Sequence, residues 1–260
     1  MLKRLTVLLS ALIFVAALGG RANATGIDLD FGTSLYNLIK NNGYITEGDK
    51  RFSDFTFTLW SSNLSKTSPD NAGGINVAGV TLGGNHGLAF FPSSFDSLFY
   101  ASQGATLKIV IGYKVTVTDP NLEISDIHLA MGSLTEGNAT ITVTEKAYED
   151  SAHTILLGQA TVTNPPEYFD AEMVDLDHTV PMAWVTKEIL INGGSGCEMN
   201  PHHGGGGYTC KSSGKIAFIK QLVSQERPPQ DIPEPSTFFL LGSGLVGLIT
   251  RFRKGGAERT

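Results

Sequence analysis

Apolar and polar side chains alternate along the central part of this chain. The clearest case has an apolar residue at every second position, namely Leu107, Ile109, Ile111, Tyr113, Val115 and Val117. The positions between them include Lys108, Lys114 and Thr116, so the two sets of side chains point to opposite faces. A period of two sustained over this length is typical of a half-buried β-strand. We therefore expect a long strand over Leu107–Val117, with its apolar face in a core.

Shorter stretches of the same kind occur along most of the chain, and turn-forming residues separate them. The expected strands are Phe55–Leu59, Ile75–Leu82, Gly87–Phe91, Leu122–Ala130, Thr140–Thr144, Ile155–Thr163, Trp184–Ile191 and Lys215–Val223. One short helix is expected from Ser34 to Asn41. Many short strands at fairly regular spacing predict an all-β fold, a single antiparallel β-sandwich of jelly-roll-like or Ig-like type.

The amino terminus has the pattern of a secretory signal peptide. Lys3 and Arg4 form a charged start, Leu5–Leu18 is almost wholly apolar, and Ala22 and Ala24 form a small-x-small cleavage site. We therefore predict a signal helix within residues 1–24, passage through the Sec translocon, and cleavage by signal peptidase. An uncleaved anchor is the alternative, which the short apolar run disfavours because a membrane span needs about 20 residues.

The carboxyl terminus carries three segments in a fixed order. The polar motif Pro233-Glu234-Pro235-Ser236-Thr237 comes first, the apolar run Phe238–Thr250 follows, and Arg251, Arg253 and Lys254 come last. The apolar run predicts a transmembrane helix, and the basic residues are expected to stay in the cytoplasm as a stop signal. The polar motif then lies outside the membrane, within reach of a processing enzyme. A buried core helix is the alternative for an apolar run of this length.

This tail resembles the PEP-CTERM sorting signal of Gram-negative bacteria, from Pro233 through Lys254. The body resembles proteins of the same group more loosely, at Ile45–Phe55, Trp184–Ile189 and Gln221–Gln225. The resemblance implies an exosortase as processing partner, with the inner membrane as a transient location. It also implies a cell-surface or extracellular protein, in bacteria that make exopolysaccharide and often form biofilms. It carries over no catalytic residue.

Removing both ends leaves one acidic body. We expect a sandwich domain in residues 25–224, a linker in 225–232 and the sorting tail in 233–260. The chain has 19 basic and 25 acidic residues, of which the signal peptide holds three basic ones, and the segment after Pro235 four basic ones and one acidic one. Residues 25–235 therefore carry 12 basic and 24 acidic residues, a net charge of −12. Such a body repels phosphates, which argues against nucleic acid as a partner.

The two cysteines, Cys197 and Cys210, enclose a glycine-rich segment that contains His202 and His203. In an oxidising exported compartment, two cysteines in one loop most simply form a disulfide. A zinc site that uses both cysteines and both histidines is the alternative. Its spacing is wrong for a zinc finger, and a flexible loop does not preorganise ligands. A metal contact by the two histidines alone is a further alternative, but no cofactor is expected.

Acidic side chains are concentrated between Asp170 and Asp177, and His178 follows them. Calcium binds oxygen-rich loops of this kind, but the spacing of an EF-hand loop is missing. We therefore interpret this segment as a solvated acidic loop.

No catalytic constellation emerges from the sequence. Gly242-Ser243-Gly244 falls inside the apolar run of the tail, where a nucleophile elbow cannot form. The histidines outside the cysteine loop have no evident partners, and no pair of carboxylates stands out. We therefore expect that the protein is not an enzyme.

Exposed aromatic side chains are a common means of holding sugars on β-sandwiches. The candidates are Trp60, Tyr100, Tyr168, Trp184 and Tyr208, for which core packing or a role as a turn anchor is the simpler interpretation. We expect a structural or adhesive protein of the exopolysaccharide matrix. The alternatives are a carbohydrate-binding or carbohydrate-active secreted protein, or a metal-binding module.

Overall fold

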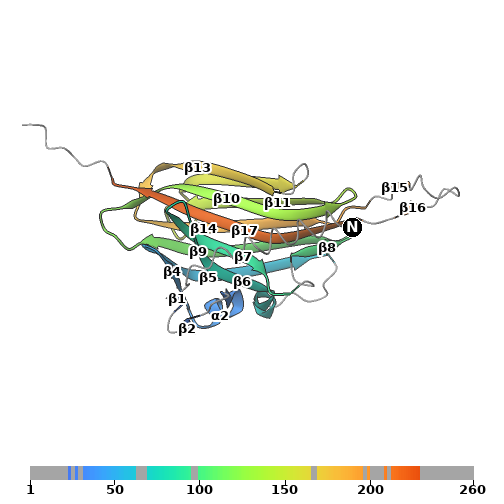
Figure 1. Ribbon diagram of the computed structural model, residues 1–260, viewed down its shortest axis with the longest axis horizontal. Coiled ribbons are helices and arrows are strands. Elements are labelled where there is room, and N and C mark those ends of the chain that lie inside the picture. Colours follow the sequence, from blue (N-terminus) through green and yellow to red (C-terminus); the bar gives the residue numbers. More distant parts are fainter. Residues whose placement is uncertain are drawn as a thin grey trace, which may run out of the picture. The chain divides into compact units, whose positions relative to one another are not determined.

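The computed structural model describes residues 23–24, 27–28, 32–62, 69–94, 99–164, 169–195, 198–199, 208–209 and 212–228. The chain divides into two units, Met1–Glu226 and Arg227–Thr260, and all the described strands belong to the first. Every strand pair is antiparallel, and most of the strands belong to two large sheets (Figure 1).

Sheet A has eight strands. Their order across the sheet is β12 (Leu156–Asn164), β11 (Thr140–Tyr148), β14 (Met182–Asn192), β9 (Thr106–Val117), β5 (Lys50–Ser61), β4 (Ile45–Glu47), β1 (Asn23–Ala24) and β2 (Ile27–Asp28). Neighbouring strands are often distant in the sequence, because each sheet takes its strands from the whole length of the chain.

Sheet B has seven strands. Six follow one another in the order β13 (Phe169–Val180), β10 (Glu123–Glu136), β17 (Ser213–Glu226), β7 (Asn85–Pro92), β6 (Ile75–Leu82) and β3 (Thr33–Ser34). The seventh, β8 (Tyr100–Ser102), pairs with β17. A separate short ladder joins β15 (Glu198–Met199) and β16 (Tyr208–Thr209).

The sequence-based prediction of an antiparallel all-β sandwich is confirmed. Each expected strand lies at least in large part within an observed strand, and β6 has the expected bounds, Ile75–Leu82. The expected short helix is α2 (Leu35–Lys40), followed later in the chain by the 3-10 helix η1 (Pro69–Gly74). Ser34 caps α2, because its hydroxyl accepts a hydrogen bond from the backbone N–H of Asn37 at 3.2 Å.

Neither terminal helix of the prediction falls within the described residues. Among the residues that the structure describes, no helix is long and apolar enough to cross a membrane. The predicted span, residues 238–250, lies outside that part of the chain.

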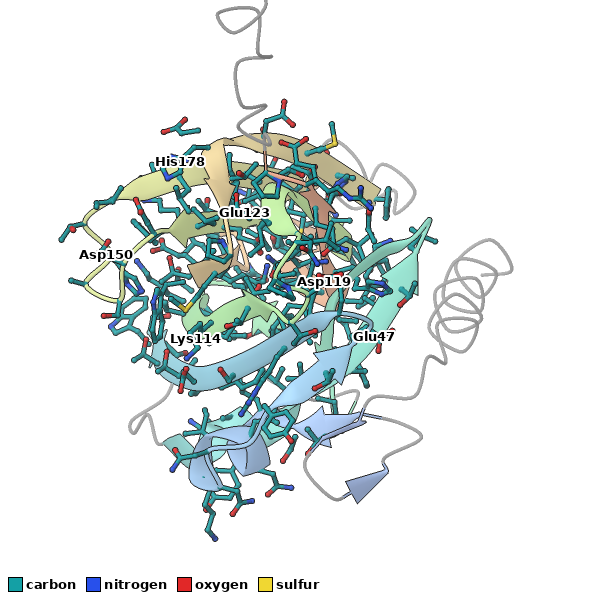
Figure 2. The ribbon with its side chains drawn as sticks, turned by 90° about the vertical axis from the view of Figure 1, so that its left-hand side faces the viewer. Glu47, Lys114, Asp119, Glu123, Asp150 and His178 are labelled. Atoms are coloured by element: carbon teal, nitrogen blue, oxygen red, sulfur yellow. The ribbon has the colours of Figure 1, made fainter. Side chains whose placement is uncertain are left out.

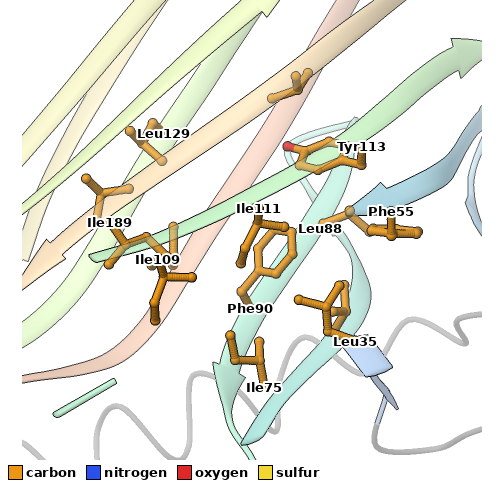
Figure 3. Close-up of a cluster of buried hydrophobic side chains, with 14 of the residues drawn as sticks. Leu35, Phe55, Ile75, Leu88, Phe90, Ile109, Ile111, Tyr113, Leu129 and Ile189 are labelled. Carbon is orange, nitrogen blue, oxygen red and sulfur yellow. The ribbon is translucent and has the colours of Figure 1, made fainter. Parts of the chain in front are cut away.

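The core lies between the two sheets, where the apolar faces of the alternating strands meet (Figure 3). Ile111 and Tyr113 reach it from β9, and Leu88 and Phe90 reach it from β7. Leu35 of α2 is also fully buried against this cluster. Full burial of one such aliphatic or aromatic side chain stabilises the fold by roughly 1.5–3 kcal/mol. The period-two pattern of the sequence is therefore the main source of the core.

One ion pair lies inside this apolar core. Glu145 on β11 and Lys187 on β14 are register partners, both side chains are fully buried, and Lys187 Nζ donates to Glu145 Oε2. Nζ also lies 5.7 Å from the ring centre of Phe90 on the opposite sheet. Burial raises the pKa of Glu145 and lowers the pKa of Lys187, and their mutual attraction opposes both shifts. The pair thus couples two strands of sheet A at a high cost of desolvation.

The acidic segment around Asp170–Asp177 is not the solvated loop that the sequence suggested. It forms most of β13, the edge strand of sheet B. Glu172 accepts a hydrogen bond from the backbone N–H of Thr161, and Asp170 accepts one from the N–H of Thr163 at 2.8 Å. Both donors belong to β12, an edge strand of sheet A. These acids therefore satisfy backbone N–H groups that could otherwise pair with a strand of another chain.

Candidate functional site

The outer face of sheet A carries exposed aromatic side chains. Trp60 on β5 is 56% exposed, whereas its neighbour Leu59 points into the core. Lys108 on β9 is the register partner of both Trp60 and Leu190, and Leu190 of β14 is 38% exposed. Thr142 on β11 continues this line beyond Leu190. We call these four residues, Trp60, Lys108, Leu190 and Thr142, the Trp60 row.

A second line of side chains crosses the same face. Tyr148 on β11, Trp184 on β14 and Lys114 on β9 are successive register partners, and all three are half-buried. Lys114 Nζ lies 5.2 Å from the ring centre of Trp184 and 2.5 Å from Asp54 Oδ2. The ring of His153 stacks on that of Tyr148, with 4.8 Å between the ring centres. Tyr148, Trp184, Lys114 and Asp54 form the Trp184 row.

The backbone of β5 places Asp54 beside Lys114. Pairing of β5 with β9 shifts register between Ser53 and Thr56, and Asp54 there has a φ of +56°. A bulge of this kind redirects a side chain, here toward the neighbouring strand. The hydrogen bond from Lys114 holds the pKa of Asp54 below its ordinary value of 3.8. The cation and the carboxylate thus neutralise each other on this face.

Small and hydroxyl-bearing residues occupy the area between the two rows. Thr56 and Thr58 are exposed on β5, and Gly112 lies opposite Thr56 on β9. A side chain at Gly112 would meet Thr56, because a Cβ there would come within 2.4 Å of its Oγ1. Thr144 and Thr186 continue the hydroxyl-bearing surface on β11 and β14. The middle of the face is therefore rich in hydrogen-bonding groups. It is low around Gly112, whereas Glu188 on β14 and Lys146 on β11 carry longer side chains there.

The loop beside the Trp184 row depends on Asp150. This carboxylate accepts hydrogen bonds from the backbone N–H of Thr154 at 2.8 Å and of Ile155 at 2.9 Å, and from the Thr154 hydroxyl. The bond from Ile155 contributes most to holding the pKa of Asp150 below its ordinary value of 3.8. In Figure 2, Asp150 and Lys114 are both labelled to the left of Glu47.

A lowered pKa makes the contribution of Asp150 depend on pH. The folded protein binds the proton less readily than the unfolded chain, so the stabilisation is present above about pH 4 and is lost as the pH falls through the lowered pKa. We expect Asp150→Asn to lower Tm at neutral pH, and the difference from the wild type to shrink in acid. Thermal unfolding of both proteins over a pH series measures this. A difference that stays constant down to the lowest pH would contradict the assignment.

A separate polar network lies where β4 turns into β5. Gly48, with φ +58°, and Asp49 form the two-residue hairpin loop of the Ile45–Phe55 segment. Lys50 is almost fully buried and its Nζ donates to Asp49 Oδ1 at 3.1 Å and to Gln225 Oε1 at 2.5 Å. Burial lowers the pKa of Lys50 against the opposing effect of Asp49. These bonds join the hairpin of sheet A to β17 of sheet B.

Two histidines, His86 and His128, lie near this end of the sandwich. His86 contacts the Thr81 hydroxyl at 2.8 Å, and that hydroxyl donates to Glu47. His128 Nε2 lies 2.9 Å from Ser224 Oγ and 2.7 Å from Asp126 Oδ1. A serine–histidine–carboxylate triad needs the two partners on different ring nitrogens. Here one nitrogen faces both partners, so this arrangement is not such a triad.

The other sequence-predicted site residues are distributed unevenly. Ala24 ends β1. The others lie outside the described residues, namely Ala22, the sorting motif Pro233–Thr237, the basic residues Arg251, Arg253 and Lys254, both cysteines, His202 and His203. Within the described ranges, no group of three or more His, Cys, Asp or Glu residues is placed to hold a metal ion.

Of the five candidate aromatic residues, two are well exposed. Trp60 and Tyr100 are 56% and 47% exposed, so of the two simpler interpretations core packing is excluded for both. Trp184 is half-buried, and the side chains of Tyr168 and Tyr208 are not described. The sequence did contain a signal for the exposure of Trp60, because Trp60 alternates with the inward-facing apolar residues of its strand. The register of Trp60 with Lys108 and Leu190 could not be predicted from the sequence.

The tail matches a known sorting signal. Residues 231–254 match the family model of the PEP-CTERM protein-sorting motif. The chain therefore carries a signal for export and for sorting to the cell surface or the extracellular space. No curated protein matches the chain.

Several solved structures match the chain at low sequence identity and low TM-score. A carbohydrate-binding module, TmCBM61 in complex with β-1,4-galactotriose, is 7% identical, with 65% of this chain and 88% of that chain covered and a TM-score of 0.29. A family 29 carbohydrate-binding module is 14% identical, with 70% and 96% covered and a TM-score of 0.23. The enzymatically active domain of bacteriophage CBA120 tailspike protein 4 is 9% identical, with 66% and 19% covered and a TM-score of 0.27. Likenesses at this level assign no ligand or activity to this chain.

Proposed function

Because the chain carries a PEP-CTERM sorting signal, we propose that it is a non-enzymatic protein of the cell surface or extracellular matrix. An exosortase-type enzyme processes it, and the mature body binds exopolysaccharide through the outer face of sheet A. This binding makes the protein a structural or adhesive component of the matrix.

The exposure of Trp60 on the outer face of sheet A carries this proposal. Tryptophan is buried on average, and an exposed apolar side chain beside polar groups is typical of a binding surface. A pyranose ring has C–H bonds on its faces and hydroxyl groups at its rim. The indole of Trp60 offers a flat apolar surface to such a ring, and Lys108 on the neighbouring strand offers hydrogen bonds to its rim.

The charges of the same row suit a sugar ligand better than a charged protein or a nucleic acid. Lys108 Nζ forms a 2.8 Å ion pair with Glu188 Oε2, and both side chains are exposed. Such a pair supplies both donors and acceptors while adding no net charge. Hydroxyl groups can both donate and accept hydrogen bonds, so they match this combination.

Replacing Trp60 with alanine tests the proposal. The mature protein is recovered from the native organism, both of its termini are read by mass spectrometry, and its binding to the organism's own exopolysaccharide is measured. We expect Trp60→Ala to weaken binding about tenfold or more, because exposed tryptophans that stack on a ligand dominate binding energy. Thermal unfolding should change little, because Trp60 lies outside the core.

Tyr100→Ala provides the matched control. Tyr100 is also an exposed aromatic residue, but it belongs to β8 of sheet B. We expect this variant to bind like the wild type. Incubation of the wild type with the polysaccharide is expected to release no new reducing ends. Equal binding by Trp60→Ala and wild type would remove the face from the proposal, and release of reducing ends would replace a binding protein with an enzyme.

A further inference from the structure

The Trp184 row lies on the same face as the Trp60 row, at the other end of the strands. On β9, Lys108 belongs to the first row and Lys114 to the second. Lys114 comes six positions after Lys108, which corresponds to about 20 Å along an extended strand. Trp60 lies on one side of β9 and Trp184 on the other, so a line that joins the two aromatic side chains crosses the sheet obliquely.

The surface between the rows is suited to a chain laid flat. Gly112 lacks a side chain, and Thr56 and Thr58 beside it are short and exposed. Between the two aromatic ends, the larger outward side chains on β5, β9 and β14 are the half-buried Val110 and the exposed Glu188, which is paired with Lys108. A single sugar ring is too short to contact both Trp60 and Trp184 at once. A chain of several linked sugars can contact both and can bond to the hydroxyl groups between them.

The pairing of the two lysines in the rows and the net charge of the body disfavour an acidic chain, and the one further lysine between the rows is the half-buried Lys146 on β11. The lysines that flank the aromatic side chains are each paired with a carboxylate, Lys108 with Glu188 and Lys114 with Asp54. Neither lysine therefore offers an uncompensated positive charge to a uronate or a phosphate. The body as a whole carries a net charge of −12, from 12 basic and 24 acidic residues in the range 25–235. A polyanion would be repelled over the distance of a Debye length, about 10 Å in 0.1 M salt.

We infer that the outer face of sheet A has two aromatic subsites, one at Trp60 and one at Trp184, that bind an extended, uncharged stretch of polysaccharide. This inference rests on the proposed function and deepens it in two respects, the length of the ligand and its charge. The Trp184 row is a binding subsite in its own right, and the threonines between the rows contact the intervening sugars.

The length of the ligand is tested with fragments of the native exopolysaccharide. Anion exchange separates it into neutral and acidic fractions, and partial hydrolysis of the neutral fraction followed by size separation gives a length series. Affinity is expected to rise with length until a fragment spans about 20 Å, the distance between the rows along β9, and then to level off. Trp184→Ala is expected to weaken the long fragments about tenfold, to the affinity of the short ones.

A second variant distinguishes a loss of binding from a loss of folding. Trp184 is half-buried, so Trp184→Ala can also destabilise the sheet. Thr58→Arg places a bulky side chain at an exposed position between the rows, and it leaves both aromatic residues in place. We expect it to weaken the long fragments more than the short ones, with the Tm of the wild type. Long fragments that bind equally to both variants and the wild type would overturn the second subsite.

The charge of the ligand is tested with the two fractions at low salt and in about 1 M NaCl, where the Debye length is about 3 Å. We expect the neutral fraction to bind equally well at both salt concentrations, and the acidic fraction to bind weakly. Tight, salt-sensitive binding of the acidic fraction would overturn the inferred ligand class while leaving polysaccharide binding intact. Failure of both fractions to bind would instead overturn the proposed function.

Discussion

Replacing Lys187 with methionine is expected to lower the free energy of unfolding by about 3–5 kcal/mol. Lys187 and Glu145 are fully buried and bonded to each other within sheet A. The substitution leaves the Glu145 carboxyl group in an apolar core without its partner, so the protein must either bury an unpaired charge or protonate the group. Urea denaturation followed by fluorescence measures the change, and the protein has two tryptophans to report it.

The double variant Glu145→Leu/Lys187→Met separates the cost of an unpaired charge from the value of the pair. Apolar replacements of buried ion pairs are often neutral or stabilising. We therefore expect the double variant to recover most of the loss seen in the single variant. A single variant with wild-type stability would contradict the burial and pairing of these residues.

Replacing Phe90 with alanine is expected to cost about 3–5 kcal/mol, because it removes a large fully buried ring and leaves a cavity. Phe90 reaches from sheet B to sheet A, where its ring centre lies 6.0 Å from that of Tyr113. It also lies beneath the Nζ atom of Lys187. The loss therefore affects the contact between the two sheets, and the denaturation experiment used for Lys187 measures it.

Phe169→Ala is the matched control for this substitution. Phe169 is 51% exposed on the edge strand β13, where its ring makes a tilted contact with Phe218. We expect a cost below about 1.5 kcal/mol, since little area is uncovered and the ring contact is worth roughly 0.5–1.5 kcal/mol. Equal costs at both positions would mean that Phe90 does not bridge the sheets as described.

The strands were predictable because the evidence for them is local. In β9 the apolar residues from Leu107 to Val117 occupy alternate positions, and this alone places them on one face. The same rule assigns Glu145 to the inner face of β11, in line with Ile141 and Val143. It does not reveal which residue neutralises Glu145, because Lys187 belongs to a strand that comes much later in the sequence.

The acidic edge strand was mistaken for a loop for a related reason. Asp170 and Glu172 reduce the strand propensity of their segment. Their role depends on β12, because they accept hydrogen bonds from backbone N–H groups of that strand. It therefore also depends on two sheet edges lying side by side. The sequence of one segment does not show which other strand will lie beside it in the fold.

The sequence by itself determined the sorting motif near the carboxyl end and the class of fold. A sorting motif is read by other proteins in a short linear segment, and strand alternation is a property of neighbouring residues. Only the tertiary structure decided the surface on which we base the proposed function. Trp60, Lys108 and Leu190 come from three strands, and the hydrogen-bond register between those strands sets them in one row. Register follows from the packing of the whole sandwich, since a slip of one residue would turn these side chains into the core.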